Sequence, residues 1–264
     1  MQVAELSLLT QQVLWAAFAV SLVFGAIVQR THFCAMGAVS DIVNMGDWTR
    51  MRQWVLAMGV AIVGFALMAR LGWIDASKAL YAVPRWNWLS ALVGGLMFGV
   101  GMVLASGCGS KTLVRLGAGN LKSLVVFVVM GLASFATLKG LTSLWRVATV
   151  DRVGIDLAGS ATLGPLLARQ TGLDAQTAGL VCALLVGGAL VVWALAASEA
   201  RRVDSLLAGL GVAGGVLAMW WVSGHLGHIA EHPETLEETF LRTNSGRMES
   251  LTFVAPQAYT LELL

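Results

Sequence analysis

Long apolar runs separated by short polar segments dominate the pattern along this chain. A transmembrane helix needs about 20 predominantly apolar residues, with about 17 as the lower limit. Six runs meet or approach that length, and none of them shows the alternation of a strand. The pattern therefore predicts an all-α fold, a polytopic transmembrane helix bundle, with spans at 13–28, 54–71, 89–106, 121–138, 177–198 and 205–223.

The composition supports a bilayer as the surrounding solvent. Apolar residues make up 57% of the 264 residues and charged residues 12%, whereas soluble domains carry about 25% charged residues. Too little polar surface remains to cover a globule in water. The 17 Lys and Arg residues fall between the apolar runs rather than in one patch, so we expect the lipid bilayer, and no nucleic acid, as a partner.

The first half of the chain contains an internal repeat. When Phe24-Gly25 is placed over Phe98-Gly99, Cys34 falls on Cys108. After a short gap, Ala57-Met58-Gly59 falls near Val129-Met130-Gly131. Each repeat unit, at about 13–71 and 89–138, has a glycine-bearing span, a short polar segment with one cysteine, and a second span. Irregular backbone at membrane depth is tolerated only beside protein or a cavity. Paired broken helices are typical of transporters, and the breaks point to the substrate site.

The second polar segment suits a small anion. It offers backbone N–H groups at the two glycines, a thiol, hydroxyls and a nearby cation, which together resemble an anion site at a helix N-terminus. The glycine spacing and the missing preceding strand exclude a nucleotide-binding loop. The predicted substrate-path residues of this segment are Gly107, Cys108, Gly109, Ser110 and Lys111.

A basic residue accompanies each of the two cysteines. Arg30 precedes Cys34, and Lys111 follows Cys108; both would attract an anion. We therefore add Arg30 and Cys34 to the predicted path. For the glycines alone, close packing of helices is the better interpretation.

The remaining cysteine and the histidines predict no metal or cofactor. Three cysteines without a CxxC spacing support neither a disulfide framework nor a structural zinc site. Cys182 lies in a purely apolar run and is interpreted as a small hydrophobic side chain. The spacing of His225, His228 and His232 would place them on one helical face, but interfacial histidines at a span end are the preferred interpretation over metal ligands.

Two segments carry a resemblance to a known family. The segment 24–41 contains Gln-Arg-x-x-x-Cys, and the segment 99–123 contains Gly-Cys-Gly-Ser followed by Arg-Leu-Gly-Ala-Gly-Asn-Leu-Lys-Ser. Together they resemble the YeeE/YedE family of bacterial inner-membrane proteins, whose functionally studied members take up thiosulfate. The resemblance implies a multi-pass protein of the bacterial inner (cytoplasmic) membrane. It also implies that Cys34 and Cys108 pass a thiosulfate anion along a central path through thiol hydrogen bonds.

The chain departs from the family pattern in its second half. The later glycine-cysteine motif with the third path cysteine is missing, and Cys182 does not match it. We expect a transmembrane domain at 1–224, with further spans at 177–198 and 205–223, and a polar tail at 225–264. Longer family members continue with more spans, so the tail is expected to begin a missing second half, either of a longer chain or supplied by a separate protein.

These observations favour membrane transport of a small sulfur-containing anion, thiosulfate first. No ATP-binding motif is present, so transport would be secondary or facilitated unless a partner supplies energy, and no enzymatic activity is expected. One alternative is a membrane-embedded sulfur carrier that forms a persulfide on Cys34 or Cys108 and hands it to a soluble sulfur-carrier partner. The other is a non-transporting membrane subunit.

Overall fold

The computed structural model describes residues 3–157, 162–172, 174–233 and 236–262. Within these residues six helical segments are long and apolar enough to cross a membrane, as the hydrophobic pattern predicts. The protein is therefore a polytopic transmembrane helix bundle. The candidate spans are Glu5–Met45, Thr49–Arg70, Trp88–Gly117, Leu121–Leu138, Ala175–Leu195 and Val203–Leu226.

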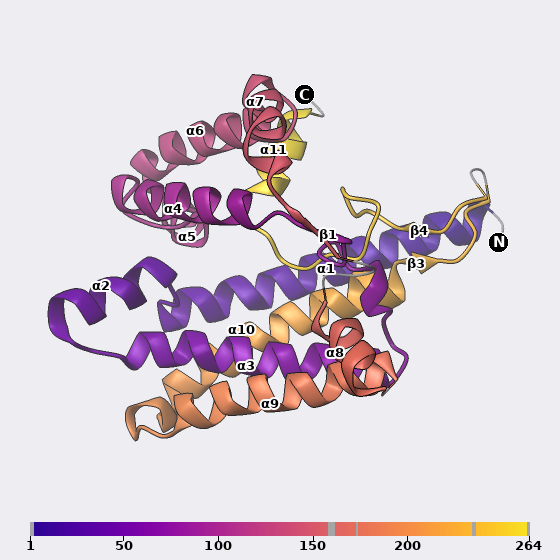
Figure 1. Cartoon of the computed structure of the whole chain (residues 1–264). Coiled ribbons are helices and arrows are strands. Elements are labelled where there is room, and N and C mark those ends of the chain that lie inside the picture. Colours follow the sequence, from indigo (N-terminus) through magenta and orange to yellow (C-terminus); the bar gives the residue numbers. More distant parts are fainter. Residues whose placement is uncertain (1–2, 158–161, 173, 234–235, 263–264) are drawn as a thin grey trace. The chain divides into compact units, whose positions relative to one another are not determined.

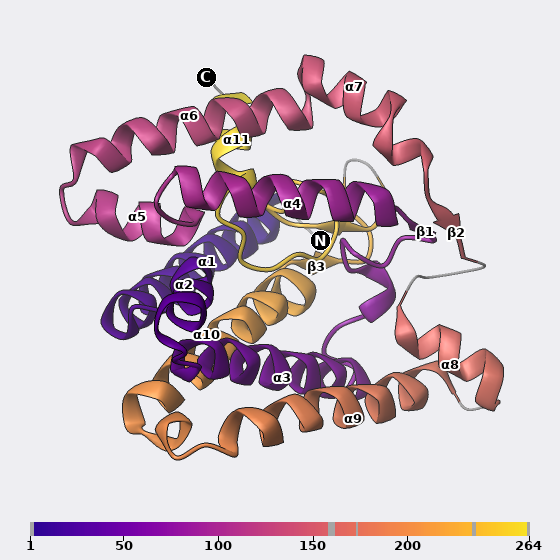
Figure 2. The same ribbon diagram turned by 60° about the vertical axis from the view of Figure 1, so that its left-hand side comes forward.

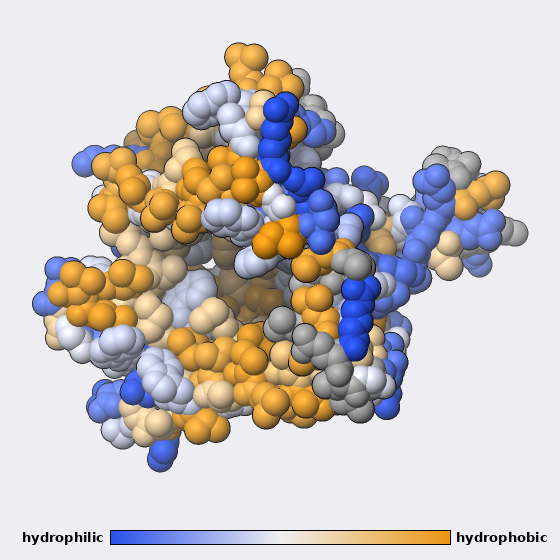
Figure 3. Space-filling view, viewed as in Figure 1, coloured by the Kyte–Doolittle hydropathy of each residue, from blue (hydrophilic) through white to orange (hydrophobic). Residues whose placement is uncertain are grey.

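The chain divides into two compact units, which are described separately. Unit 1 comprises Met1–Phe33, Trp48–Val83 and Gly159–Leu251, and unit 2 comprises Cys34–Asp47, Pro84–Ala158 and Thr252–Leu264. Both units combine segments that are distant in the sequence (Figures 1 and 2). Figure 3 shows apolar side chains over much of the helical surface, as expected where lipid replaces water.

Unit 1 is a bundle of four long helices with short connecting elements. Its helices α3, α9 and α10 pack side by side, and α1 packs on α10 (Figure 1). The elements of unit 1 are α1 (Val3–Thr31), α3 (Thr49–Arg70), η1 (Ala76–Lys78), α8 (Leu163–Thr171), α9 (Ala175–Leu195), η3 (Glu199–Arg201), α10 (Val203–Trp221), η4 (Val222–Leu226), β3 (His228–Ile229) and β4 (Thr239–Phe240).

Glycines set the packing distance between α3 and α9. A Cβ atom added to Gly59 would lie 2.7 Å from the carbonyl oxygen of Gly187, and one added to Gly187 would lie 2.8 Å from the carbonyl oxygen of Gly59. Only hydrogen atoms fit in that space, so the two backbones can approach closely and gain dispersion contacts. Close helix packing at small residues therefore occurs at these two glycines.

The tail of the sequence contributes to the core of unit 1. Strands β3 and β4 pair antiparallel, and Met248 is fully buried in a cluster with Met68, Trp220 and Phe240. The largely polar segment 231–248 therefore contains two core side chains, Phe240 and Met248, and this part of the tail is folded onto unit 1.

Unit 2 is built around α4, α5 and α6. Helices α5 and α11 pack on α6, and β1 pairs antiparallel with β2. Asn120 begins α6 by accepting hydrogen bonds from the backbone N–H groups of Lys122 and Ser123, the usual role of an N-cap. The elements of unit 2 are α2 (Ala35–Met45), β1 (Arg85–Trp86), α4 (Trp88–Leu104), α5 (Gly109–Gly117), α6 (Leu121–Leu138), α7 (Leu141–Ala148), η2 (Val150–Arg152), β2 (Ile155–Asp156) and α11 (Ala255–Glu262).

Candidate functional site

The two cysteines lie at two helix breaks that have the same backbone conformation. His32 and Ser106 both adopt left-handed conformations, with φ of 50° and 57°, which is uncommon for residues other than glycine. The residue after each donates a backbone hydrogen bond to the carbonyl five positions back, from Phe33 to Val28 at 3.2 Å and from Gly107 to Met102 at 3.0 Å.

The next helix begins directly after each cysteine. Cys34 is the N-cap of α2, which starts at Ala35, and Cys108 is the N-cap of α5, which starts at Gly109. All these pairs are 74 residues apart, as are the two cysteines. At the breaks, the backbone therefore agrees residue for residue with the alignment inferred from the sequence.

The short gap in the alignment also has a structural counterpart. Helix α2 has 11 residues and α5 has 9, so the offset should fall by 11 − 9 = 2, from 74 to 72. The following helices start at Thr49 and Leu121, and 121 − 49 = 72. Duplication of the complete units, including the spans, stays a prediction.

The two thiols meet within unit 2. The Sγ atoms of Cys34 and Cys108 are 3.8 Å apart, and Cys34 is buried with 7% of its surface exposed. The Cys34 Sγ also accepts a hydrogen bond from the backbone N–H of Gly37 at 3.5 Å. Nothing in the sequence states this proximity, because the two residues belong to different polar segments.

Cys108 has more polar neighbours than Cys34. Its Sγ lies 3.0 Å from the Ser110 hydroxyl oxygen. Buried Thr112 donates its hydroxyl hydrogen to the Cys108 carbonyl at 3.2 Å. Because Cys108 is the N-cap, the first backbone N–H groups of α5, which have no partner within the helix, lie beside its thiol.

The two glycines beside Cys108 are positions of close approach. A Cβ atom added to Gly107 would lie 2.9 Å from the Lys111 side chain, and one added to Gly109 would lie 3.2 Å from Phe253. Phe253 precedes α11 and lies far along the chain, so the sequence gives no signal of its contact with this site. The glycines keep the start of α5 compact and bring the Lys111 stem against it.

Arg115 was not among the residues predicted for the path, yet it holds the second break. Its Nη1 donates to the carbonyl oxygen of Ser106 at 3.2 Å, satisfying a backbone acceptor at the end of α4. The sequence did contain a signal for this residue, because Arg115 begins the motif Arg-Leu-Gly-Ala-Gly-Asn-Leu-Lys-Ser that follows Gly-Cys-Gly-Ser.

Arg30 lies in the other unit. Its side chain is 73% exposed and its Nη2 is 4.0 Å from Asp204 Oδ1 at the start of α10. Arg30 therefore has an ion-pair partner in unit 1, whereas the other six predicted path residues belong to unit 2. Its role on a path stays a prediction.

The inferred helical face of histidines is wrong. His225 lies in the wide turn η4, where its Nδ1 is 3.0 Å from the Trp73 carbonyl oxygen, and His228 lies on strand β3. The helix ends at Leu226, so His228 and His232 do not lie on a helical face with His225. Among the described residues, no three His, Cys, Asp or Glu side chains converge on a possible metal position.

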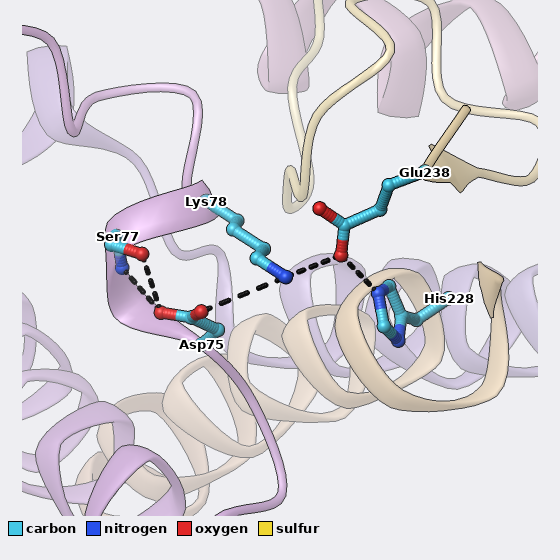
Figure 4. A network of polar contacts seen from close by, with 5 residues as sticks. All are labelled: Asp75, Ser77, Lys78, His228 and Glu238. Carbon is cyan, nitrogen blue, oxygen red and sulfur yellow. Dashed lines mark hydrogen bonds and ion pairs between the residues drawn. The ribbon is translucent and has the colours of Figure 1, made fainter. Parts of the chain in front are cut away.

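His228 belongs instead to a polar network outside the candidate spans (Figure 4). Glu238 contacts both the Lys78 ammonium and His228 Nε2, and Asp75 Oδ2 lies 3.8 Å from Lys78 Nζ. The hydrogen bond from Lys78, and then that from His228, lowers the pKa of the Glu238 carboxyl; the same Glu238 contact raises the pKa of Lys78. This network joins the segment after α3 to the β3–β4 hairpin of unit 1.

Cys182 differs from the other two cysteines. It is half-buried in the regular helix α9, and in the described part of the chain its thiol has no hydrogen-bond partner. In the described structure, α9 continues without a break through this position. The structure thus groups Cys34 with Cys108 and leaves Cys182 apart.

The fold and these breaks define a class, a multi-pass membrane protein whose helices are interrupted at paired cysteines. A sulphur-transport family model matches residues 30–264. The chain belongs to this family, which includes the YeeE/YedE proteins.

Two thiosulfate transporters named TsuA are among the similar proteins. The one from Spirochaeta thermophila is 26% identical over 198 residues, which are 72% of this chain and 56% of that protein. The one from Escherichia coli is 34% identical over 110 residues, 40% of this chain and 30% of that protein. The probable transporter YedE of Salmonella typhimurium is 32% identical over 92 residues, 35% of this chain and 21% of that protein. The chain thus spans about half, or less, of the length of the curated relatives that it matches.

Proposed function

We propose that this protein transports a small sulfur-containing anion, most favourably thiosulfate, across the bacterial cytoplasmic membrane, on a path past Cys34 and Cys108. The observation that carries the proposal is the 3.8 Å separation of the two thiols, each at the start of a helix that follows a break in a candidate span. Membership of a sulphur-transport family and similarity to two thiosulfate transporters support it.

The start of α5 supplies the groups that an anion needs when it loses water. The backbone N–H groups after Cys108 and the positive end of the helix dipole favour negative charge. The Ser110 hydroxyl lies 3.0 Å from the Cys108 thiol, so a hydroxyl donor and a thiol donor face one place. Gly107 lets the Lys111 stem pack against the start of α5, and the Lys111 ammonium adds positive charge.

Paired thiols favour a soft sulfur atom over oxygen. Thiosulfate carries diffuse charge and a terminal sulfur, so stripping its water costs less than for sulfate. Thiols are weak hydrogen-bond donors, so position and softness decide their value more than strength does. Weak contacts at neighbouring binding positions also suit transport, because the anion must dissociate from each position as well as bind to it.

The proposal assigns transport of the secondary or facilitated kind, and no enzymatic step. The path would be completed by helices that correspond to the unmatched part of the longer relatives, whether in the same polypeptide or in a second protein. Arg30 would act away from the thiols, as attraction for anions in general.

Competition between anions tests the proposal directly. The full chain is reconstituted in proteoliposomes, and uptake of labelled thiosulfate is measured with unlabelled thiosulfate or sulfate as competitor. Wild type should be inhibited by thiosulfate at concentrations well below those of sulfate. The Cys108→Ser variant should lose most of that preference, because a hydroxyl treats the two anions alike. Equal inhibition by sulfate in wild type would refute the selectivity mechanism.

The thiol pair also keeps the sulfur-carrier alternative open to test. A thiol that accepts the terminal sulfur of thiosulfate becomes a persulfide and releases sulfite, whereas a transported anion leaves unchanged. Mass spectrometry of Cys34 and Cys108 after incubation with thiosulfate, together with a sulfite assay, separates the two. Persulfide and sulfite in equal amounts, without uptake, would favour the carrier.

A further inference from the structure

A second polar site lies where α4 begins and α7 ends, in the same unit as the cysteines. An open pocket of about 510 Å³ is lined by Arg85 from β1, by one face of α7, and by the turn η2. Strand β1 leads into α4 and α7 follows α6 closely (Figure 2). Helix α4 has 17 residues, so this pocket lies about 25 Å along α4 from the break at Cys108. The lining residues are Arg85, Leu144, Val147, Ala148, Asp151 and Arg152.

Neighbouring groups already engage the carboxylates around this pocket. Asp151 accepts a hydrogen bond from the Ser90 hydroxyl at 2.6 Å on one oxygen, and its other oxygen is 3.4 Å from Arg146 Nε. Asp156 Oδ1 lies 3.8 Å from Arg85 Nε. Three guanidinium groups therefore face two carboxylates, which leaves one positive charge uncompensated.

Arg152 carries that uncompensated charge. Its backbone carbonyl accepts a hydrogen bond from Arg85 Nη2 at 2.7 Å, which fixes the turn, while its exposed side chain has no partner in the described ranges. A guanidinium presents parallel N–H donors that match two oxygens of a phosphate. The pocket thus offers a free phosphate-binding fork beside a second arginine.

The wall of the pocket formed by α7 is apolar and exposed. Leu144 and Val147 line the pocket and are 70% and 53% exposed. Leu141 and Trp145, outside the lining, are 84% and 74% exposed and share a helical face with Leu144 at the i, i+3, i+4 spacing. Because α7 begins three residues after the candidate span α6 ends, it falls at the membrane–water interface. Short amphipathic helices with tryptophan at that depth insert their apolar face between headgroups and acyl chains.

We infer that this pocket binds the headgroup of an anionic phospholipid, with the phosphate on Arg152 and Arg85 and the acyl chains against α7. A soluble anion would contact the arginines but leave the apolar side chains of Leu144 and Val147 exposed, whereas a lipid contacts both the arginines and these side chains. A zwitterionic headgroup binds less favourably, because it brings a positively charged ammonium group toward the two guanidinium groups. A soluble phosphate and a lipid headgroup both present a phosphate oxyanion to the arginines, and only the lipid also has acyl chains that can contact α7.

Lipid retention by the purified full chain tests this inference. The protein is reconstituted in vesicles of equal phosphatidylglycerol and phosphatidylcholine, extracted in mild detergent, and its bound lipids are counted by native mass spectrometry. Wild type should retain phosphatidylglycerol over phosphatidylcholine. Arg152→Gln should lower that preference about five-fold, the ratio expected for one basic residue beside an anionic lipid surface. Arg152→Lys should keep most of it, because the charge remains.

Controls separate this site from general surface charge and from a soluble ligand. Arg70→Gln removes another exposed arginine, at the end of α3, and should leave the lipid ratio unchanged. Inorganic phosphate at millimolar concentration should not displace phosphatidylglycerol. The inference is overturned if wild type retains both lipids equally, if Arg152→Gln behaves as Arg70→Gln does, or if phosphate displaces the lipid. Thiosulfate uptake is measured separately, so failure here leaves the proposed function untouched.

Discussion

The two helix breaks have the same backbone and different chemistry. Each has a left-handed residue, a backbone bond to the carbonyl five positions back, and a cysteine that begins the next helix. At the first break, the Cys34 thiol accepts a backbone hydrogen bond and contacts the other thiol, and it has no further partner among the described residues. At the second, Cys108 has the Ser110 hydroxyl beside it, and Arg115 holds the Ser106 carbonyl.

This difference indicates how two breaks with one backbone conformation can differ in function. The shared backbone positions two thiols at helix starts, and the side chains around them decide what each thiol offers a ligand. We expect the second break to set selectivity and the first to provide a neighbouring binding position.

Removing the thiol of the second break should have the largest effect. Cys108→Ala should reduce thiosulfate uptake more than about ten-fold, since a hydrogen bond to a charged group contributes about 1.5–3 kcal/mol. Cys182→Ala should leave uptake nearly intact, because its thiol lies in a regular apolar helix. Initial rates in proteoliposomes at matched protein content provide the measurement. Equal losses in both variants would remove the distinction between the cysteines.

Mild oxidation should link the two breaks selectively. Diamide takes two hydrogen atoms from the Cys34 and Cys108 thiols and joins their sulfurs in one disulfide, because they lie 3.8 Å apart. Peptide mapping should find this pair at least about ten-fold more often than any pair with Cys182. Excess thiosulfate should slow the reaction, because an anion bound beside the thiols limits access of the oxidant. Random pairing among the three cysteines would contradict the shared site.

Substitutions at the two left-handed residues test whether the breaks are equivalent. Ser106→Val puts a β-branched side chain in a left-handed conformation, at a cost of about 1–3 kcal/mol, and should lower folded yield and uptake several-fold. Ser106→Gly should be tolerated, because glycine adopts that conformation without strain. His32→Val and His32→Gly are the matched pair at the first break. Yield by fluorescence-detected size exclusion compares them, and tolerance of valine at one break only would show that the breaks are not equivalent.

The smallest effect is expected from a site outside both breaks, the Glu238 network. The pKa of Glu238 is lowered in the folded protein, so its stabilising contribution is present above the unfolded carboxyl value, about 4.3, and is lost as pH falls through the folded value. Glu238→Gln should therefore flatten the loss of thermal stability as the pH falls below the unfolded carboxyl value and leave uptake at pH 7 unchanged. An unaltered acid profile would show that Glu238 does not contribute.

The spans and the breaks could be predicted from the sequence because both depend on local patterns. Apolar length fixes which segments can cross a bilayer, and all six predicted runs lie within or largely overlap the candidate spans. The 74-residue offset and its two-residue gap follow from matched cysteines and glycines, and the helix starts reproduce them.

Local patterns failed where a residue's partner is distant. The histidine spacing fits one helical face, yet the helix ends at Leu226 and the hairpin takes His228. The sequence places Arg30 four residues before Cys34 and gives no sign of its ion-pair partner Asp204, which lies on another helix. The role of Arg30 on a path stays a prediction. In both cases spacing along the chain does not report which element packs alongside.

The sequence by itself therefore determined that this protein is a membrane helix bundle with two cysteine-bearing breaks, because hydrophobic length and glycine placement act within one segment. Only the tertiary structure decided that Cys34 and Cys108 share one place, that Phe240 and Met248 of the tail complete a core, and that three arginines gather beside α7. These outcomes depend on contacts between residues far apart in the chain, which are chosen by packing and charge in three dimensions.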